Sequence, residues 1–256
     1  MVGRVSDSLL GKVAFVTGGT GGMGRAIASV LALRGARVAV ADLYERSAEF
    51  DAVLGGLETQ GVGVACDVRR SASIQSAVAE AAAALGGMDI VVCNAGVNVR
   101  RASFDVSEED WDTVLDVNLR GVFFTAQAGA AEMVRRGQGG KIVSIASIMG
   151  LVASSRSSAA YCASKAGVVN LTRALAIEWA EHGIQVNAVA PTYARTPLTE
   201  RLFDDSALVE SILERTPNRQ LVTPEQIGEA VAFLASPAAD MITGVTLPVD
   251  GGWTAW

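Results

Sequence analysis

Charged side chains of either sign, aromatic rings and histidine are scarce in this sequence. Only 19% of the 256 residues are charged and 5% are aromatic, whereas 50% are hydrophobic. The 21 lysines and arginines are outnumbered by 27 aspartates and glutamates, which gives a net charge of −6. An acidic chain with scattered arginines offers no basic patch for a phosphate backbone, so we expect no nucleic-acid partner.

Long apolar runs are absent as well, which argues against a membrane partner. No run of 18 apolar residues occurs in the sequence, although a membrane-spanning helix needs about 20. Residues 1–10 contain Arg4 and Asp7 instead of the apolar core of a signal peptide. We therefore expect a cytoplasmic protein.

The sequence is also poor in side chains that bind metals. Its three cysteines are odd in number and widely spaced, which favours small buried side chains over disulfides or metal ligands. They are Cys66, Cys93 and Cys162. The single histidine, His182, cannot build a histidine-based metal site by itself. We expect no bound metal.

Glycine, by contrast, is abundant and gathers near the start of the chain. The apolar run 13–16 is followed by the glycine-rich stretch 17–24, and then by residues 25–34 with apolar side chains at helical spacing. This order predicts a buried strand, a tight turn and a helix. Glycine lets a backbone approach a pyrophosphate closely, and the following helix offers unpaired N–H groups to phosphates. The stretch is a candidate dinucleotide-binding turn, although glycine-rich loops also occur without ligands.

A second candidate site combines a phenol with an ammonium group. Tyr161 and Lys165 are i and i+4 in a helix-forming run, so they share one face of a helix. A tyrosine is a poor base at neutral pH, because its ordinary pKa is about 10. A neighbouring lysine cation stabilises the phenolate and so favours a lower pKa. Most tyrosine and lysine pairs at this spacing only pack and are solvated, so the rest of the chain must decide.

Together the two motifs resemble the short-chain dehydrogenase/reductase (SDR) family. The family patterns T-G-x-x-x-G-x-G and Y-x-x-x-K are matched by Thr17, Gly18, Gly22, Gly24, Tyr161 and Lys165. The resemblance implies a single-domain α/β fold of the Rossmann type, with a doubly wound parallel sheet of seven strands flanked by helices. It covers the chain from about residue 8 onward, and we expect one domain over residues 1–256. The expected parts are a dinucleotide-binding region at 8–150, a catalytic helix and substrate lid at 151–222, and a C-terminal helix and edge strand at 223–256.

The acid that selects the cofactor is expected at Asp42. This residue ends the strand expected at 37–41, where a dinucleotide fold places the carboxylate that binds the adenosine ribose. A 2′-phosphate about 4 Å away would meet a repulsion on the order of 4 kcal/mol per charge pair at an effective dielectric near 20. Gly21 agrees, because NADP-preferring members of the family often carry a basic residue at that place. The predicted cofactor is therefore NAD, and Arg46 leaves some use of NADP open.

The resemblance also implies the remaining cofactor contacts. Asp67 and Val68 correspond to adenine contacts, and the N-A-G triplet lines the cofactor with small residues. Thr192 stands where the family has glycine, while Thr196 matches the residue that binds the carboxamide. The predicted cofactor residues are Gly18, Thr20, Gly22, Met23, Gly24, Asp42, Asp67, Val68, Asn94, Ala95, Gly96, Tyr161, Lys165, Pro191, Thr192 and Thr196.

Two further residues complete the catalytic set that the resemblance implies. Ser147 follows the fifth expected strand and would hydrogen-bond the substrate oxygen. Asn118 resembles the family residue that bends its helix and holds a proton-relay water. Tyr161 would take the hydroxyl proton, while Lys165 lowers the pKa of Tyr161 and binds the nicotinamide ribose. The interval from Ser147 to Tyr161 is 161 − 147 = 14 residues, about one longer than in many members of the family.

The predicted activity is hydride transfer between NAD and a small-molecule secondary alcohol or ketone. The polar segment 154–158 favours a polyol or sugar alcohol. The closing residues 249–256 agree, because they resemble the ends of some polyol and sugar dehydrogenases. A 3-oxoacyl thioester or another ketone is the alternative substrate, and a catalytically silent NAD-binding regulator is the alternative of another class. The intact catalytic set favours the enzyme.

The apolar composition indicates that surfaces are buried between subunits. The helix expected at 159–181 has more apolar residues than one face needs, and the family pairs this helix with its copy in a second subunit. Trp253 and Trp256 would be unusual on a frayed terminus. We therefore expect a homotetramer, with the tryptophans at a subunit contact. The irregular, polar segment 197–216 is expected to form a mobile lid over the substrate.

Overall fold

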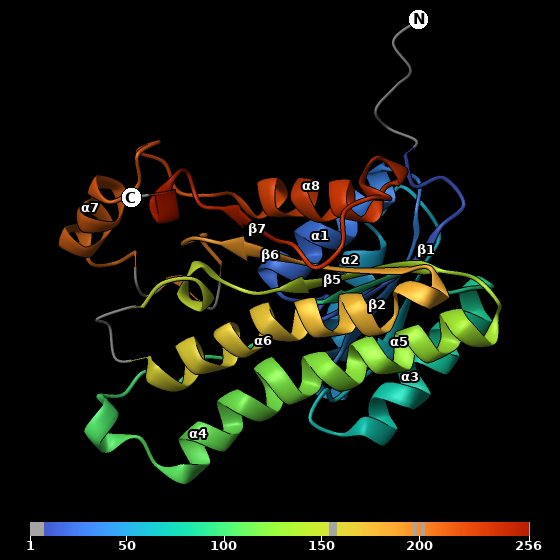
Figure 1. Ribbon diagram of the computed structural model, residues 1–256, viewed down its shortest axis with the longest axis horizontal. Helices are drawn as coiled ribbons and strands as arrows, with labels where there is room; N and C mark the ends of the chain where they lie inside the picture. Colours follow the sequence, from blue (N-terminus) through green and yellow to red (C-terminus); the bar gives the residue numbers. More distant parts are fainter. Residues whose placement is uncertain (1–7, 154–157, 197–198, 201–202, 256) are drawn as a thin grey trace, which may run out of the picture.

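The protein is built around one parallel sheet of seven strands. The structure is a computed structural model that describes residues 8–153, 158–196, 199–200 and 203–255. The strand order is β3-β2-β1-β4-β5-β6-β7, and each neighbouring pair is parallel (Figure 1). The strands are β1 (Val13–Thr17), β2 (Arg37–Asp42), β3 (Gly61–Ala65), β4 (Ile90–Cys93), β5 (Gly140–Ile145), β6 (Ile184–Pro191) and β7 (Thr246–Val249). The predicted doubly wound sheet is confirmed.

Helices cover both faces of the sheet (Figure 1). One face carries α1 (Gly22–Leu33), α2 (Ser47–Leu54) and α8 (Pro224–Ala235), and the other carries α3 (Ser71–Leu85), α5 (Gly121–Arg135) and α6 (Ala159–Glu178). The shorter α4 (Glu108–Leu115) leads into α5, and α7 (Ser206–Glu214) lies beyond the sheet near the C-terminus. Among the described residues, no helix combines the length and the apolar character needed to cross a membrane.

The inner strands are buried on both faces, which explains their nearly continuous apolar sequences. Every residue of β1 and of β4 is buried. The edge strand β7 differs, because it pairs with β6 and contains Pro248. Proline has no N–H to donate to a ladder, so it belongs at an edge. The predicted edge strand is confirmed.

Side-chain caps fix the starts of two helices. The Ser107 hydroxyl and the Asp110 carboxylate form a capping box at α4, and Thr223 and Gln226 form another at α8. Each box satisfies two N–H groups that a helix start leaves unpaired. The sequence did not indicate α2, since this short helix buries only Phe50 and Val53 and so shows little periodicity.

The C-terminal tryptophan that the structure describes packs inside its own chain. Trp253 is 6% exposed and lies against Tyr193, with ring centroids 5.7 Å apart. The guanidinium carbon of Arg215 stands 5.0 Å from the centroid of the Trp253 ring. Residues after β6 and α7 cover Trp253, and the subunit contact expected for the C-terminal end stays a prediction. Trp256 lies outside the described residues.

The parallel sheet brings distant segments to one edge. Because all seven strands run in the same direction, the segments that follow them meet at the carboxyl edge of the sheet. In Figure 1 the arrowheads of β5 and β6 point toward the side on which α7 lies. The polar residues that follow β1, β2, β4, β5 and β6 are thereby gathered into one region.

Candidate active site

The glycine-rich turn between β1 and α1 is fastened to the loop after β4. Gly18 has a φ of +63°, a conformation that side chains rarely adopt. A Cβ at Gly24 would lie 2.1 Å from the Gly18 oxygen, so α1 begins in contact with the turn. The Asn94 amide donates to the backbone oxygens of Thr17 and Gly18, at 2.9 and 3.1 Å. The turn is thus fixed against the sheet by glycine at two places and by one half-buried amide.

Asp42 ends β2, and three donors hold its carboxylate. Its Oδ2 accepts hydrogen bonds from the backbone N–H and the hydroxyl of Thr20, at 3.1 and 2.6 Å. Its Oδ1 accepts one from the N–H of Leu43 at 2.9 Å. A carboxylate accepts about four hydrogen bonds, so Oδ1 keeps capacity for a ribose hydroxyl. Since Asp42 is only 7% exposed, its orientation is set by the protein itself.

The predicted adenine side of the site follows β3. The Asp67 carboxylate accepts hydrogen bonds from Arg69 Nε at 3.0 Å and from Arg69 Nη2 at 2.8 Å. This pairing is the main cause that lowers the pKa of Asp67. Val68 packs on α5, where a Cβ at Gly121 would lie 3.1 Å from the Val68 Cβ. Any adenine amino group at Asp67 would therefore share the carboxylate with Arg69.

Three of the four predicted catalytic residues form one cluster beyond the end of β5. Ser147 follows this strand, and a hydrogen bond joins its hydroxyl to the Tyr161 phenol. The Lys165 Nζ lies 5.7 Å from the centroid of the Tyr161 ring and donates to the Ile145 oxygen at 2.7 Å. Lys165 is 3% exposed, so α6 buries its ammonium group against the end of β5.

Asn118, the fourth predicted catalytic residue, joins the cluster through the loop after β4. It lies in a fully buried position in the π-helical turn Asp116–Arg120, between α4 and α5. Its Oδ1 accepts from the Val97 N–H and its Nδ2 donates to the Val97 oxygen, both at 2.8 Å. Nδ2 also donates to the Ser164 hydroxyl at 3.2 Å. Asn118 thus lies where a π-helical turn separates α4 from α5, and both the bend and the proton-relay role stay predictions.

Burial shifts the pKa values of the two titrating side chains in opposite directions, because it disfavours the charged form of each. It raises the pKa of the Tyr161 phenol, and the hydrogen bond with Ser147 opposes that rise. It lowers the pKa of Lys165 to about 8. The net effect on the phenol is a raised pKa, because its desolvation outweighs the hydrogen bond with Ser147. The role of Lys165 in lowering the pKa of Tyr161 stays a prediction.

Sequence reasoning missed two residues close to the Tyr161 phenol. Tyr193 raises the pKa of Tyr161 and Arg100 lowers it, so both lie within electrostatic reach of the phenol. Arg101 pairs with Asp110 at 2.6 Å, whereas Arg100 is exposed and has no ion pair with a described residue. A signal was present in the sequence, since two consecutive arginines stand shortly after the N-A-G triplet.

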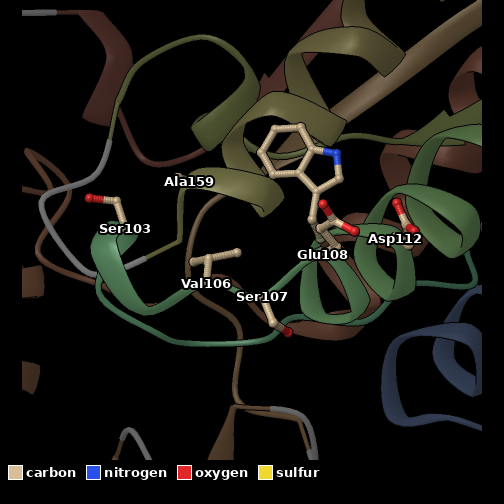
Figure 2. A pocket seen from close by; sticks show the side chains of 7 residues that line it. Ser103, Val106, Ser107, Glu108, Asp112 and Ala159 are labelled. Atoms are coloured by element: carbon tan, nitrogen blue, oxygen red, sulfur yellow. The ribbon is translucent and has the colours of Figure 1, made fainter.

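A hollow of about 520 Å³ lies beside the start of α6 (Figure 2). It is lined by Ser103, Val106, Ser107, Glu108, Trp111, Asp112 and Ala159. The carboxylates of Glu108 and Asp112 make its wall acidic. Ala159 stands two residues before Tyr161, yet the catalytic residues are not among the lining residues. The hollow therefore flanks the catalytic cluster.

The segment after β6 contains Thr192, at the position where the family usually has glycine. Thr192 is 9% exposed, and its hydroxyl has no hydrogen-bond partner among the described residues. Its φ is not positive, so a side chain in place of the usual glycine causes no backbone strain. The Thr196 and Thr199 hydroxyls are 3.1 Å apart. Residues 154–157 of the polar segment, and 197–198 and 201–202 of the predicted lid, lie outside the described residues.

A parallel sheet with this strand order, a glycine turn after its first strand and a serine, tyrosine and lysine cluster are features of dinucleotide-dependent oxidoreductases. Comparison with known proteins identifies the family. The family described as Enoyl-(Acyl carrier protein) reductase matches residues 18–254. The chain belongs to the short-chain dehydrogenase/reductase family.

Curated relatives match nearly the whole chain. The D-threitol dehydrogenase of Mycolicibacterium smegmatis is 42% identical over 95% of this chain and 93% of that protein. The 2-dehydro-3-deoxy-D-gluconate 5-dehydrogenase of Escherichia coli is 39% identical over 97% of both chains. Both relatives are dehydrogenases, so the chain is an oxidoreductase that acts on CH–OH groups of secondary alcohols.

Solved structures of three relatives have the same fold. A short-chain type dehydrogenase/reductase from Mycobacterium marinum has a TM-score of 0.91 and 38% identity, over 98% of both chains. A gluconate 5-dehydrogenase from Burkholderia cenocepacia, in complex with NADP and tartrate, has a TM-score of 0.91 and 35% identity, over 98% of this chain and 99% of that one. A 3-ketoacyl-(acyl-carrier-protein) reductase from Brucella melitensis, complexed with NADH, has a TM-score of 0.88 and 35% identity, over 96% and 99%. The cofactor is thus a nicotinamide dinucleotide.

The buried ammonium group of Lys165 predicts a pH-dependent stability of the cofactor-free protein. Its pKa is about 8 in the folded protein and about 10.4 in the unfolded chain, so the unfolded chain binds more protons between these values. Stability should therefore rise as the pH increases from about 8 to about 10, by up to about 3 kcal/mol. Lys165→Met should lack this rise, which urea unfolding at several pH values measures. If the free energy of unfolding depended on pH equally in the wild type and in Lys165→Met, the effect could not be assigned to Lys165.

Proposed function

We propose that this protein uses NAD to oxidise a secondary hydroxyl of a polyol or sugar, and reduces the corresponding ketone in the reverse direction. One observation carries the proposal: Ser147, Tyr161 and Lys165 cluster beyond β5, at the same sheet edge as the glycine turn and Asp42. The catalytic cluster would face the reacting carbon, and Asp42 would hold the adenosine end of the cofactor.

The residues present fit a nicotinamide dinucleotide. The glycine turn offers a phosphate site, and Asp42 keeps acceptor capacity for a ribose hydroxyl. Asn94 Oδ1 and Thr192 Oγ1 are buried oxygens without a hydrogen-bond partner among the described residues, as expected where a ligand completes the bonding. When bound there, NAD supplies the hydride acceptor.

The chain's own residues handle the proton. Tyr161 accepts the proton of the substrate hydroxyl, and Ser147 hydrogen-bonds the substrate oxygen in both redox states. Lys165 keeps two of its three N–H donors after bonding to Ile145, so it can bind the nicotinamide ribose, and its charge favours the phenolate. Asn118 positions the water through which the proton reaches solvent. Burial of the phenol means that this assistance must overcome a raised pKa.

NAD is proposed over NADP because of the charge at the end of β2. The Asp42 carboxylate is buried and held by Thr20, so it cannot turn away from a 2′-phosphate. One related structure is complexed with NADH and another with NADP, so the relatives do not select between the two cofactors. The preference for NAD must therefore come from residues of this chain. The cofactor contacts and catalytic roles expected from the sequence stay predictions, as do the boundaries of the single domain and the cytoplasmic location.

The names of the relatives support a polyhydroxylated substrate. D-threitol is a neutral polyol, whereas 2-dehydro-3-deoxy-D-gluconate and gluconate are sugar acids. One observation favours a sugar acid as a second candidate. Arg100 lies within electrostatic reach of Tyr161 and carries a positive charge that no described carboxylate neutralises. The 3-oxoacyl thioester alternative has less support, because the net charge of −6 opposes an acidic carrier.

Arg100→Gln tests the sugar-acid candidate. If Arg100 binds a substrate carboxylate, its loss should lower kcat/KM for sugar acids about tenfold while neutral polyols change little, because a hydrogen bond to a charged group is worth about 1.5–3 kcal/mol. Arg101→Gln is the matched control, since Asp110 already neutralises Arg101. Equal losses with acids and neutral polyols would contradict a carboxylate contact.

Tyr161→Phe tests the proposed mechanism. The change removes the proton acceptor and leaves the ring and the glycine turn, so affinity for NAD should hold while turnover falls by at least about 10²–10⁴. Initial rates on a panel of alcohols and ketones, and titration of NAD by fluorescence, measure the two quantities. Turnover like that of the wild type would refute the role of Tyr161.

We also propose a homotetramer. An apolar hollow of about 520 Å³ lies between α5 and α6, lined in part by Leu119, Phe123, Leu171 and Ala174, and Ile177 on α6 is 79% exposed. Exposed apolar surface of this kind marks interaction sites. Light scattering at micromolar concentration should give about four times the chain mass of 26.5 kDa. A single-chain mass would rule the tetramer out.

A further inference from the structure

Three charged side chains form a chain of contacts at the adenosine end of the proposed cofactor site. Arg46 Nη1 lies 3.8 Å from Asp42 Oδ2. Glu49 takes one edge of the same guanidinium, with Nε donating to Oε1 at 3.0 Å and Nη2 donating to Oε2 at 2.6 Å. This bidentate pairing is the strong form of an arginine–carboxylate contact.

Both partners of this pairing are charged, and both reach the glycine turn. The hydrogen bond with Glu49 is the main cause that raises the pKa of Arg46, and the same contact is the main cause that lowers the pKa of Glu49. The Thr20 hydroxyl also contributes to lowering the pKa of Glu49. A Cβ at Gly21 would lie 4.0 Å from Arg46 Nη1. With Asp42 ionised, the three side chains carry a net charge of −1.

A group attached to the adenosine ribose near Asp42 would lie next to Arg46. An unpaired arginine there would favour a 2′-phosphate, since its planar fork binds phosphate through two parallel hydrogen bonds. In this structure Glu49 occupies the Nε and Nη2 donors, which form one such fork. Arg46 keeps the donors of Nη1 and the second N–H of Nη2 for a ligand, but its charge is already offset by Glu49.

We propose that Glu49 is a specificity-determining residue, which disfavours NADP by holding Arg46 in this bidentate contact. The inference rests on the proposed binding of NAD at Asp42. It explains why Arg46 does not reverse the preference for NAD over NADP that the Asp42 carboxylate would set. Glu49 acts through Arg46, and it is therefore a positioning residue.

Glu49→Gln tests the proposal, because it removes the charge and keeps one acceptor for Arg46. Affinity for NADPH should rise about fivefold relative to NADH, the upper range for an exposed ion pair. The kcat with saturating NADP should stay unchanged, since the catalytic cluster is not altered. Fluorescence titration with NADH and NADPH measures both affinities without any substrate. Glu132→Gln on α5 is the matched control, because Glu132 makes the same bidentate contact with Arg135.

A double-mutant cycle shows whether the effect passes through Arg46. In the Arg46→Gln background, Glu49→Gln should no longer raise the affinity for NADPH. An equal gain in both backgrounds would show that Glu49 acts by its own charge, and it would overturn the proposal. An unchanged affinity ratio in Glu49→Gln would overturn it as well. Failure of the proposed cofactor preference is separate, because it would appear as tighter binding of NADPH by the wild type.

Discussion

The buried ammonium group of Lys165 is the interaction on which the site depends. An ammonium group removed from water is costly unless it is hydrogen-bonded, and here the last residue of β5, Ile145, supplies the acceptor. This bond fixes α6 against the carboxyl edge of the sheet. The same docking places Tyr161 beside Ser147, so the structural contact and the catalytic geometry have one cause. Burial then raises the pKa of the phenol that the proposed mechanism uses as a base.

Side-chain amides fix the loops around this cluster. Asn94 joins the glycine turn to the loop after β4, and Asn118 joins that loop to α6 through Val97 and Ser164. A buried amide that lost these partners would incur a penalty of about 1–3 kcal/mol, so each loop has one preferred arrangement. The cofactor side and the proton-transfer side are therefore connected by side-chain hydrogen bonds, independently of the strand ladder.

Charged side chains lie at both ends of the proposed site. Those at one end act on the choice of cofactor, and those at the other end act on the choice of substrate. At the proposed adenosine end, Asp42 and Glu49 both form ion pairs with Arg46. At the substrate end, Arg100 is a cation without an ion pair among the described residues, beside Arg101 whose charge is neutralised. The relatives differ in cofactor and in substrate charge, which is consistent with local charges setting both properties on one fold.

The sequence by itself determined the first strand, turn and helix, the edge strand and the shared helix face of Tyr161 and Lys165. These features depend on local periodicity, on Pro248 and on the i, i+4 spacing of Tyr161 and Lys165, all of which can be read along the chain. The seven-stranded sheet, Ser147 and Asn118, by contrast, were expected from the resemblance to the family. Only the tertiary structure decided that Trp253 is covered by its own chain and that burial raises the pKa of Tyr161. Burial and electrostatic neighbours arise from segments far apart in sequence, so no local pattern could give them.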